Sequence, residues 1–248
     1  MAAATAPKPI SRPGARDRVF FSGMAIAMAL AVFIGFSRTY FLSWFFGTHA
    51  TVTGAPFTTV VHVHAALFTA WVLLFIVQTA LVATRRVAVH RRLGVVGAAL
   101  AAGMIVAGIA ISIAAARRGA APPGLTPEGF LVVPLGDTAL FALFVVVALL
   151  QRRNKDAHKR LMLLAYTAIA VAGVARIPGV LAHGPLAFFS LTYIPVLLLG
   201  MSYDFFTMRR VHPVYLWGGA LLILSVPVRL ALSGTQLWQS FAGMLMGK

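Results

Sequence analysis

Residues 66–103 read ALFTAWVLLFIVQTALVATRRVAVHRRLGVVGAALAAG, two apolar runs joined by a short arginine-rich connection. A helix needs about 20 apolar residues to cross a hydrocarbon core about 30 Å thick. Runs of that length recur along the chain, so we expect transmembrane helices over residues 19–43, 57–83, 93–116, 130–151, 160–182, 186–208 and 215–233. The sequence therefore predicts an all-α, polytopic membrane helix bundle with seven transmembrane helices.

The order of features in this stretch appears a second time. Residues 139–173 read ALFALFVVVALLQRRNKDAHKRLMLLAYTAIAVAG, which again gives an aromatic-containing span, Arg-Arg, a spacer, a His-Lys-Arg-Leu motif and an Ala-rich span. Both copies run in the same direction, so a duplicated helical hairpin would be a parallel repeat. The alternative is that unrelated spans reuse similar basic loops.

The composition excludes most other classes of protein. Hydrophobic residues make up 60% of the chain and charged residues only 10%, against about 25% charged in soluble domains. The net charge of +16 indicates topology signals and contacts with membrane lipids, not nucleic acid, because the cations lie in short loops beside apolar spans. The lack of cysteine excludes disulfides, thiolate chemistry, iron–sulfur clusters and covalently attached haem.

The cations are distributed unevenly between the two sides of the predicted bundle. One side carries 15 lysines and arginines and the other carries 3. This bias predicts a cytoplasmic N-terminus and an external C-terminus. Residues 1–18 would form a cytoplasmic basic tail, residues 19–233 the transmembrane domain, and residues 234–248 an external tail lying at the membrane interface.

The third span is rich in small residues. Gly94, Gly97, Gly103 and Gly108 stand among alanines there. Small residues let helix backbones approach closely, so we expect this span at the centre of the bundle. The same composition suits contacts with other chains, including a homo-oligomer.

Polar residues gather in the outer layer of the predicted membrane domain, at similar depths on different spans. They are Arg38, His62, His64, Asp137, Arg176, Tyr193 and Arg229. A charge at a helix centre costs about 2.5–3.5 kcal/mol on insertion scales, so such groups normally face the bundle interior and pair. We expect Asp137 to pair with Arg176 or Arg229. The alternative for Arg38 and Arg229 is that they extend to the interface, and the excess of cations suits an anionic ligand.

Two histidines of the second span differ in their expected directions. His62 and His64 lie about 200° apart around a helix, so they cannot both face one site. His64 shares a stripe with Trp71 and Gln78, which makes it the preferred cofactor and metal ligand; a hydrogen bond to a neighbouring helix is the alternative. His183, in an outer loop, is the candidate for a second ligand.

His90 and His158 occupy matching places in the two repeated segments. Arginine and lysine surround both residues, which is typical of side chains at the level of the lipid head groups. The alternative is that both turn inward and face each other across the bundle.

The stretch VHVHAALFTAWVLLFIVQTALVATRRVAVHRRLG, residues 61–94, resembles uncharacterised bacterial multi-pass membrane proteins with a His-Arg-x-Leu-Gly loop. It is more faintly similar to the ascorbate-dependent di-haem transmembrane cytochromes. The resemblance implies a bacterial inner membrane protein, with His62 or His64 as an outer ligand of haem b and His90 with His158 as an inner pair. The second copy holds Asp137 where an outer histidine would be needed, so one haem, or none, is expected.

Three classes of function are compatible with these observations. The first is a redox module that binds haem b or a quinone in the outer pocket, with Arg176, Arg229 or Arg38 balancing the ligand's charge. The second is a carrier or sensor of a small organic anion, in which Arg176 binds a carboxylate and Asp137 couples to a proton. The third is an assembly or scaffolding subunit without catalytic activity. The last span contains no lysine, which excludes retinal bound as a Schiff base.

Overall fold

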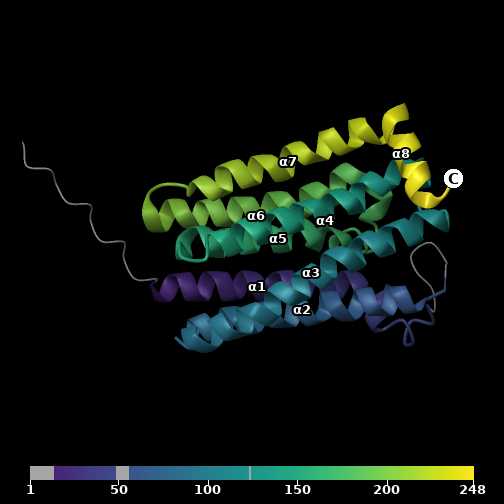
Figure 1. Cartoon of the computed structure of the whole chain (residues 1–248). Coiled ribbons are helices and arrows are strands. Elements are labelled where there is room, and N and C mark those ends of the chain that lie inside the picture. Colours follow the sequence, from purple (N-terminus) through teal and green to yellow (C-terminus); the bar gives the residue numbers. More distant parts are fainter. Residues whose placement is uncertain (1–13, 49–55, 123) are drawn as a thin grey trace, which may run out of the picture.

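Long helices running side by side make up most of the molecule. The computed structural model describes residues 14–48, 56–122 and 124–248. Its helices are α1 (Ala15–Phe36), η1 (Ser37–Phe41), α2 (Thr59–Ala83), α3 (Val87–Arg117), α4 (Pro127–Leu150), α5 (Lys155–Val174), η2 (Leu181–His183), α6 (Pro185–Met208), α7 (Pro213–Ser233) and α8 (Gln236–Met246). Helices α1 to α7 alternate in direction, and α8 lies across one end of the bundle (Figure 1). We call the end of the bundle at which α8 lies the α8 end, and the opposite end the basic end.

Six helices are long and apolar enough to cross a membrane. They are Ala15–Phe41, Thr59–Ala83, Val87–Arg117, Pro127–Leu150, Pro185–Met208 and Pro213–Ser233. The all-helical prediction is thus confirmed, and these six helices are compatible with a multi-pass membrane protein, but seven spans are not confirmed. The expected span 160–182 is replaced by the shorter α5, which carries Lys155, Asp156, Lys159 and Arg160 in its first turns. Because of these charges α5 is not among the six, although it lies side by side with the helices that are.

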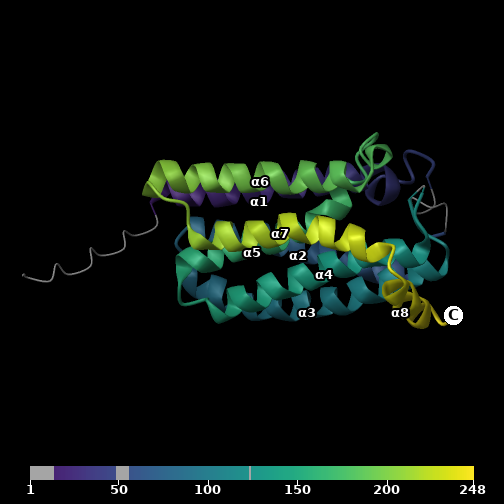
Figure 2. The ribbon, with the colours of Figure 1, turned by 90° about the horizontal axis from the view of Figure 1, so that it is seen from above.

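Helix α5, and not α3, occupies the centre of the bundle. Of its 20 residues, 13 are buried, and it contacts α1, α4, α6 and α7. Helix α3 lies along one edge (Figure 2), against α2, α4 and α8. Its glycines do serve close packing, since a Cβ at Gly97 would meet Leu74 and one at Gly108 would meet Thr138. The prediction that α3 is central was wrong because small residues report close packing and not the number of neighbours.

The two similar segments form two adjacent hairpins. Helices α2 and α3 make the first, α4 and α5 make the second, and α3 packs against α4. His90 is the fourth residue of α3, which begins at Val87, and His158 is the fourth residue of α5, which begins at Lys155. Both hairpins run in the same direction along the bundle, as a parallel repeat requires (Figure 1).

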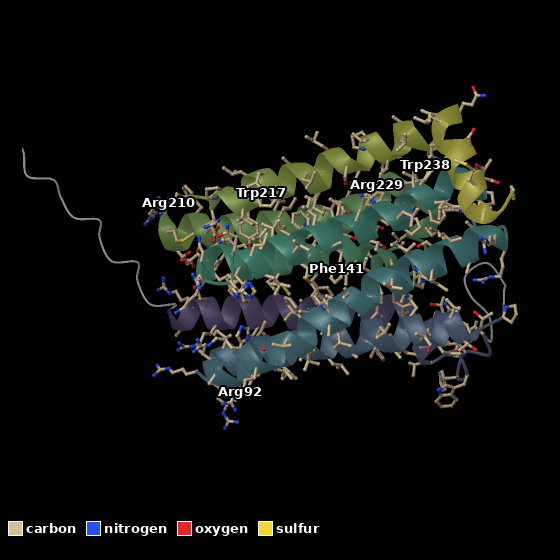
Figure 3. All side chains as sticks on the ribbon, in the orientation of Figure 1. Arg92, Phe141, Arg210, Trp217, Arg229 and Trp238 are labelled. Carbon is tan, nitrogen blue, oxygen red and sulfur yellow. The ribbon has the colours of Figure 1, made fainter. Side chains whose placement is uncertain are left out.

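An aromatic cluster fills the middle of the bundle and confirms the predicted interior stripe of α2. The Trp71 ring lies 5.2 Å from that of Phe141 and 5.5 Å from that of Tyr166. All three side chains are buried. Phe141 marks the middle of the molecule in Figure 3. This cluster joins α2, α4 and α5, and so fixes the side of α2 that faces inward.

The C-terminal segment forms α8, which is attached to the ends of α3 and α4. Trp238 Nε1 donates a hydrogen bond of 2.8 Å to the Glu128 carbonyl, and Arg117 Nη2 donates one of 2.9 Å to the Leu245 carbonyl. Ala242 is buried in this contact, while Leu237 is exposed on the other side of the helix. An apolar face turned away from the bundle suits the interfacial position expected for residues 234–248.

Candidate functional site

The predicted outer polar layer divides into two separate clusters at the α8 end. The first joins α4, α6 and α7 through an ion pair of 2.6 Å between Arg229 Nη1 and Asp137 Oδ1. Of the two partners predicted for Asp137, the structure thus gives Arg229 and not Arg176. Both paired side chains are largely buried, with exposed fractions of 6% and 13%. In Figure 3, Arg229 lies in the part of α7 nearer α8, far from Arg92 and Arg210 at the basic end.

The guanidinium of Arg229 uses all of its donors within the protein. Nε donates to the Ser225 carbonyl, Nη1 donates to the Val133 carbonyl and to Asp137, and Nη2 donates to the hydroxyls of Tyr193 and Ser225. A guanidinium has five N–H donors, so none is left for a ligand. Arg229 therefore holds three helices together and is a poor candidate for binding an anion.

Two neighbouring residues create the space for this side chain. A Cβ at Gly136 would lie 2.4 Å from Arg229 Cδ, so only glycine leaves room for the arginine stem at that place on α4. The Phe189 ring covers the guanidinium at 4.5 Å. The buried charge is thus enclosed by α4 and α6 instead of reaching the interface.

The second cluster contains a buried imidazole nitrogen that has no hydrogen-bond partner among the described residues. This atom is His64 Nδ1. The His64 ring packs against Phe68 at 4.1 Å, and Arg176 is the charged side chain that acts on it electrostatically. The Arg176 guanidinium lies 4.5 Å from the centre of the Phe36 ring and donates one hydrogen bond, of 2.6 Å, to the Ala172 carbonyl. Most of its donors therefore remain available.

A close crossing of α1 and α5 positions this cluster. A Cβ on Gly35 would lie 1.9 Å from the Gly173 carbonyl oxygen, so the two backbones touch. Phe36 follows Gly35 directly and Arg176 lies three residues after Gly173, so the crossing brings these two side chains together. The π-helical turn η1, Ser37–Phe41, begins at the same point. Such turns occur frequently at functional sites.

The two histidines of α2 point in different directions, as predicted. His62 is exposed, and its Nδ1 lies 3.0 Å from the Tyr40 hydroxyl. His64 is the one directed into the protein. Two more buried polar atoms near this end of the bundle, Thr39 Oγ1 and Thr58 Oγ1, have no hydrogen-bond partner in the described part of the chain.

Arg38 and His183 lie outside both clusters. Arg38 is exposed and rests over the Phe46 ring at 5.2 Å. His183 is exposed, and its Nδ1 donates to the Gly179 carbonyl over 2.8 Å. It borders an open, apolar hollow of about 550 Å³ that His64 does not line. Nothing in the structure brings His183 to His64 as a second ligand.

His90 and His158 face each other at the basic end. Their ring centres are 6.4 Å apart, with an angle of 83° between the rings. The inward alternative therefore describes this pair better than the prediction of two separate side chains at head-group level. Their contact joins the two hairpins at equivalent positions.

A buried ion pair at the basic end was missed by sequence reasoning. Arg160 and Asp204 make two contacts, one of them 2.9 Å between Nε and Oδ2, and their exposed fractions are only 1% and 0%. In the sequence, Arg160 belongs to a basic loop and reads as a topology signal. The isolated acid Asp204, near the end of an apolar stretch, is the signal that indicates a buried partner.

This pair continues into a network that ties α1 to α5 and α6. Lys159 Nζ lies 2.6 Å from Asp17 and also 2.6 Å from Asp156. The Tyr203 hydroxyl donates to Asp17 over 2.5 Å. Several charges at the basic end therefore stabilise helix packing besides any effect on topology. Residues 1–13 of the predicted basic tail lie outside the described residues.

Comparison with known proteins returned nothing: no protein-family model, curated protein or solved structure matches the chain.

Proposed function

We propose that this multi-pass membrane protein is a redox module that binds a quinone head group at the α8 end, between α1, α2 and α5. One observation carries the proposal: His64 Nδ1 is buried without a partner in the described chain, close to the incompletely bonded Arg176. A buried polar atom without a hydrogen bond is costly, and a ligand oxygen would remove that cost.

The aromatic surroundings favour a flat, conjugated ligand. Phe68 lies against the His64 ring, and Phe36 lies against the Arg176 guanidinium. Each hydrogen-bonding group is therefore beside a phenyl face that can pack on a planar ring. A quinone head group combines a planar apolar ring with carbonyl oxygens, which suits two aromatic rings and two polar groups.

The chemistry of the two polar side chains suits both redox states of such a ligand. A guanidinium only donates hydrogen bonds, so Arg176 would bind a carbonyl oxygen. An imidazole nitrogen accepts or donates according to its protonation, so His64 Nδ1 can accept from a quinol hydroxyl or donate to a quinone oxygen. In this proposal His64 hydrogen-bonds one ligand oxygen in both redox states.

In the outer layer, the described residues do not fit haem b, the other cofactor expected from the sequence. The described residues bring no second axial histidine to His64, because Asp137 is paired with Arg229 and His183 bonds to its own loop.

A carrier or sensor of organic anions is the second candidate, and one observation favours it. Arg176 forms no ion pair within the described residues, so a carboxylate could neutralise it. The proton-coupling role given to Asp137 has less support. Its partner Arg229 already uses every donor, and the pair lies in the other cluster.

The proposal is tested by equilibrium binding of a short-chain ubiquinone analogue to the purified chain in nanodiscs. We expect saturable binding with one site per chain. His64→Ala and Arg176→Gln should each weaken it about 10- to 100-fold, because a hydrogen bond to a charged or buried group contributes about 1.5–3 kcal/mol.

Matched controls come from the same segments. His62→Ala and Arg38→Gln change the same residue types on the exposed side, and both variants should retain binding. Equal loss in all four variants, or no binding by a well-folded wild-type chain, overturns the proposal. Displacement of the analogue by hexanoate would favour the anion candidate. A sharp alpha band in the reduced minus oxidised spectrum that disappears in His64→Ala would show that the site binds haem b instead.

A further inference from the structure

The His90–His158 pair is unused by the proposed quinone site, which lies at the opposite end of the bundle. The His158 ring is oriented by its own hairpin. His158 Nδ1 lies 2.8 Å from the Ala148 carbonyl on α4. A carbonyl only accepts hydrogen bonds, so Nδ1 carries the proton and Nε2 of the neutral ring keeps its lone pair. His90 Nδ1 is buried without a partner in the described chain.

This arrangement is the one found around metal-binding histidines. Such residues almost always donate their second ring nitrogen to a backbone carbonyl, a carboxylate or a water, which fixes the tautomer and the ring orientation. Here His158 is braced in this way by α4, the preceding helix of its hairpin. The remaining nitrogen of each ring is then available for a ligand between α3 and α5.

The separation of the rings selects the coordination geometry. With metal–nitrogen bonds of about 2 Å, the metal lies about 3 Å from the centre of each imidazole. Two rings on opposite sides of one ion are then about 6 Å apart, whereas a tetrahedral angle would bring them to about 5 Å. The observed 6.4 Å corresponds to the nearly linear arrangement. An interplanar angle of 83° is compatible with it, because each ring can rotate about its bond to the ion.

The local charge selects an ion of low charge. Arg91 acts electrostatically on His90, and no His, Cys, Asp or Glu cluster of three or more that could hold a metal occurs in the described part of the chain. Repulsion from a fixed positive charge doubles for a divalent ion. Linear coordination by two donors is typical of monovalent d¹⁰ ions, and imidazole is a suitable donor for copper.

We propose that His90 and His158 bind one Cu⁺ ion in a nearly linear bis-imidazole site that joins the two hairpins. The side-chain oxygen of Gln78, which is buried without a partner among the described residues, would lie beside this site without being needed as a ligand. The site is independent of the quinone proposal, so either can fail without the other.

The test is anaerobic titration of the purified chain in detergent with Cu⁺, in competition with a chromophoric Cu⁺ chelator. We expect one Cu⁺ per chain and an X-ray absorption edge typical of two-coordinate Cu⁺. His90→Ala and His158→Ala should each lower the affinity at least about tenfold, since even the loss of residues that only orient metal ligands costs about 10–100-fold. His62→Ala and Gln78→Ala should retain it.

A further variant separates loss of ligand from loss of fold. His90→Met keeps a side chain of similar size and supplies a thioether, a soft donor suited to Cu⁺. It should therefore bind Cu⁺ more tightly than His90→Ala, with an unchanged elution profile in size-exclusion chromatography. Wild-type binding no tighter than that of the His90→Ala/His158→Ala double variant overturns the proposal. So would stronger binding of Zn²⁺ than Cu⁺, or a haem spectrum that depends on His90.

Discussion

Arg160 on α5 and Asp204 on α6 form a two-contact ion pair that is almost completely shielded from solvent. Arg160 Nη1 also donates to the Asp156 carbonyl over 2.8 Å, and Asp204 Oδ2 accepts from the His212 backbone over 3.1 Å. Each charge is thus balanced by its partner and by further hydrogen bonds, which a buried ion pair requires. The pair links the central helix to α6 and to the connection that starts α7.

Breaking this pair should be strongly destabilising. Asp204→Asn leaves the Arg160 guanidinium buried without a counter-charge, for which we expect a loss of about 3–5 kcal/mol. In practice the thermal unfolding midpoint in detergent should fall sharply, as followed by tryptophan fluorescence. Asp156→Asn is the control, because the Asp156 side chain is about one-third exposed and its carboxylate lies 3.5 Å from Arg160 Nη1, a longer and weaker contact.

A double replacement checks the explanation. Arg160→Met combined with Asp204→Leu removes both charges and fills similar volumes, and such exchanges are often neutral or stabilising. The double variant should therefore be more stable than Asp204→Asn alone. If it is equally unstable, the pair contributes something other than charge compensation.

The α1–α5 crossing should tolerate no side chain at Gly35. Gly35→Ala places a Cβ 1.9 Å from the Gly173 carbonyl oxygen, so the two helices must separate. We expect a loss of about 1–3 kcal/mol, the usual range for overpacking. Gly23→Ala on the same helix meets nothing within 4 Å and should be neutral or slightly stabilising. Thermal unfolding of both variants gives the comparison, and equal stability would contradict the close crossing.

The outline of the fold was readable because hydropathy and helix periodicity report it directly. Six apolar runs became helices of spanning length, and the stripe through Trp71 became part of the aromatic core. The centrality of α5 was not readable, since an apolar residue buried by protein and one buried by lipid look alike in a sequence. The charges that start α5 obscured it further, because Arg160 turns inward to a partner on a helix distant in sequence.

The candidate site was predictable in depth but not in direction. Residue counting placed Asp137, Arg176 and Arg229 at one level, but the partner of Asp137 depends on how each helix is rotated. The 200° separation did predict that His62 and His64 diverge, since both lie on one rigid helix. Which of the two faces inward was settled by the packing of Trp71, two turns further along α2.

Of the two arginines of the outer layer, Arg229 should contribute to stability and Arg176 to ligand binding. Arg229→Gln removes a fully bonded guanidinium and leaves Asp137 buried, so we expect a loss of about 3–5 kcal/mol in unfolding free energy. Arg176→Gln removes no ion pair of the described chain and should leave the unfolding midpoint nearly unchanged while quinone binding falls. Thermal unfolding and analogue binding are measured on the same samples. A stable Arg229→Gln variant would show that the pair is not a structural clamp.

The last prediction concerns pH and His212, which lies in the connection between α6 and α7. Its Nδ1 accepts a hydrogen bond of 3.2 Å from the Val214 backbone and so caps α7. Burial lowers the pKa of His212 below its ordinary value of 6.5, and the positive charge of Arg160 lowers it further. Above about pH 6.5 the ring is neutral in both states. As the pH falls through 6.5, the unfolded chain takes up the proton first, so stability decreases until the folded state is protonated as well.

His212→Asn removes this titration but keeps a capping side chain, because asparagine is among the best residues at a helix N-cap. The unfolding midpoint of the wild-type chain should therefore fall more between pH 7.5 and pH 5.5 than that of the variant. His62→Asn, at an exposed position, controls for the general effect of losing a histidine and should keep the wild-type dependence. If His212→Asn keeps it as well, the acid sensitivity arises elsewhere. That result would mean that protonation of His212 does not weaken the cap of α7. It would contradict the hydrogen bond from Val214 to His212 Nδ1, because a protonated Nδ1 cannot accept a hydrogen bond.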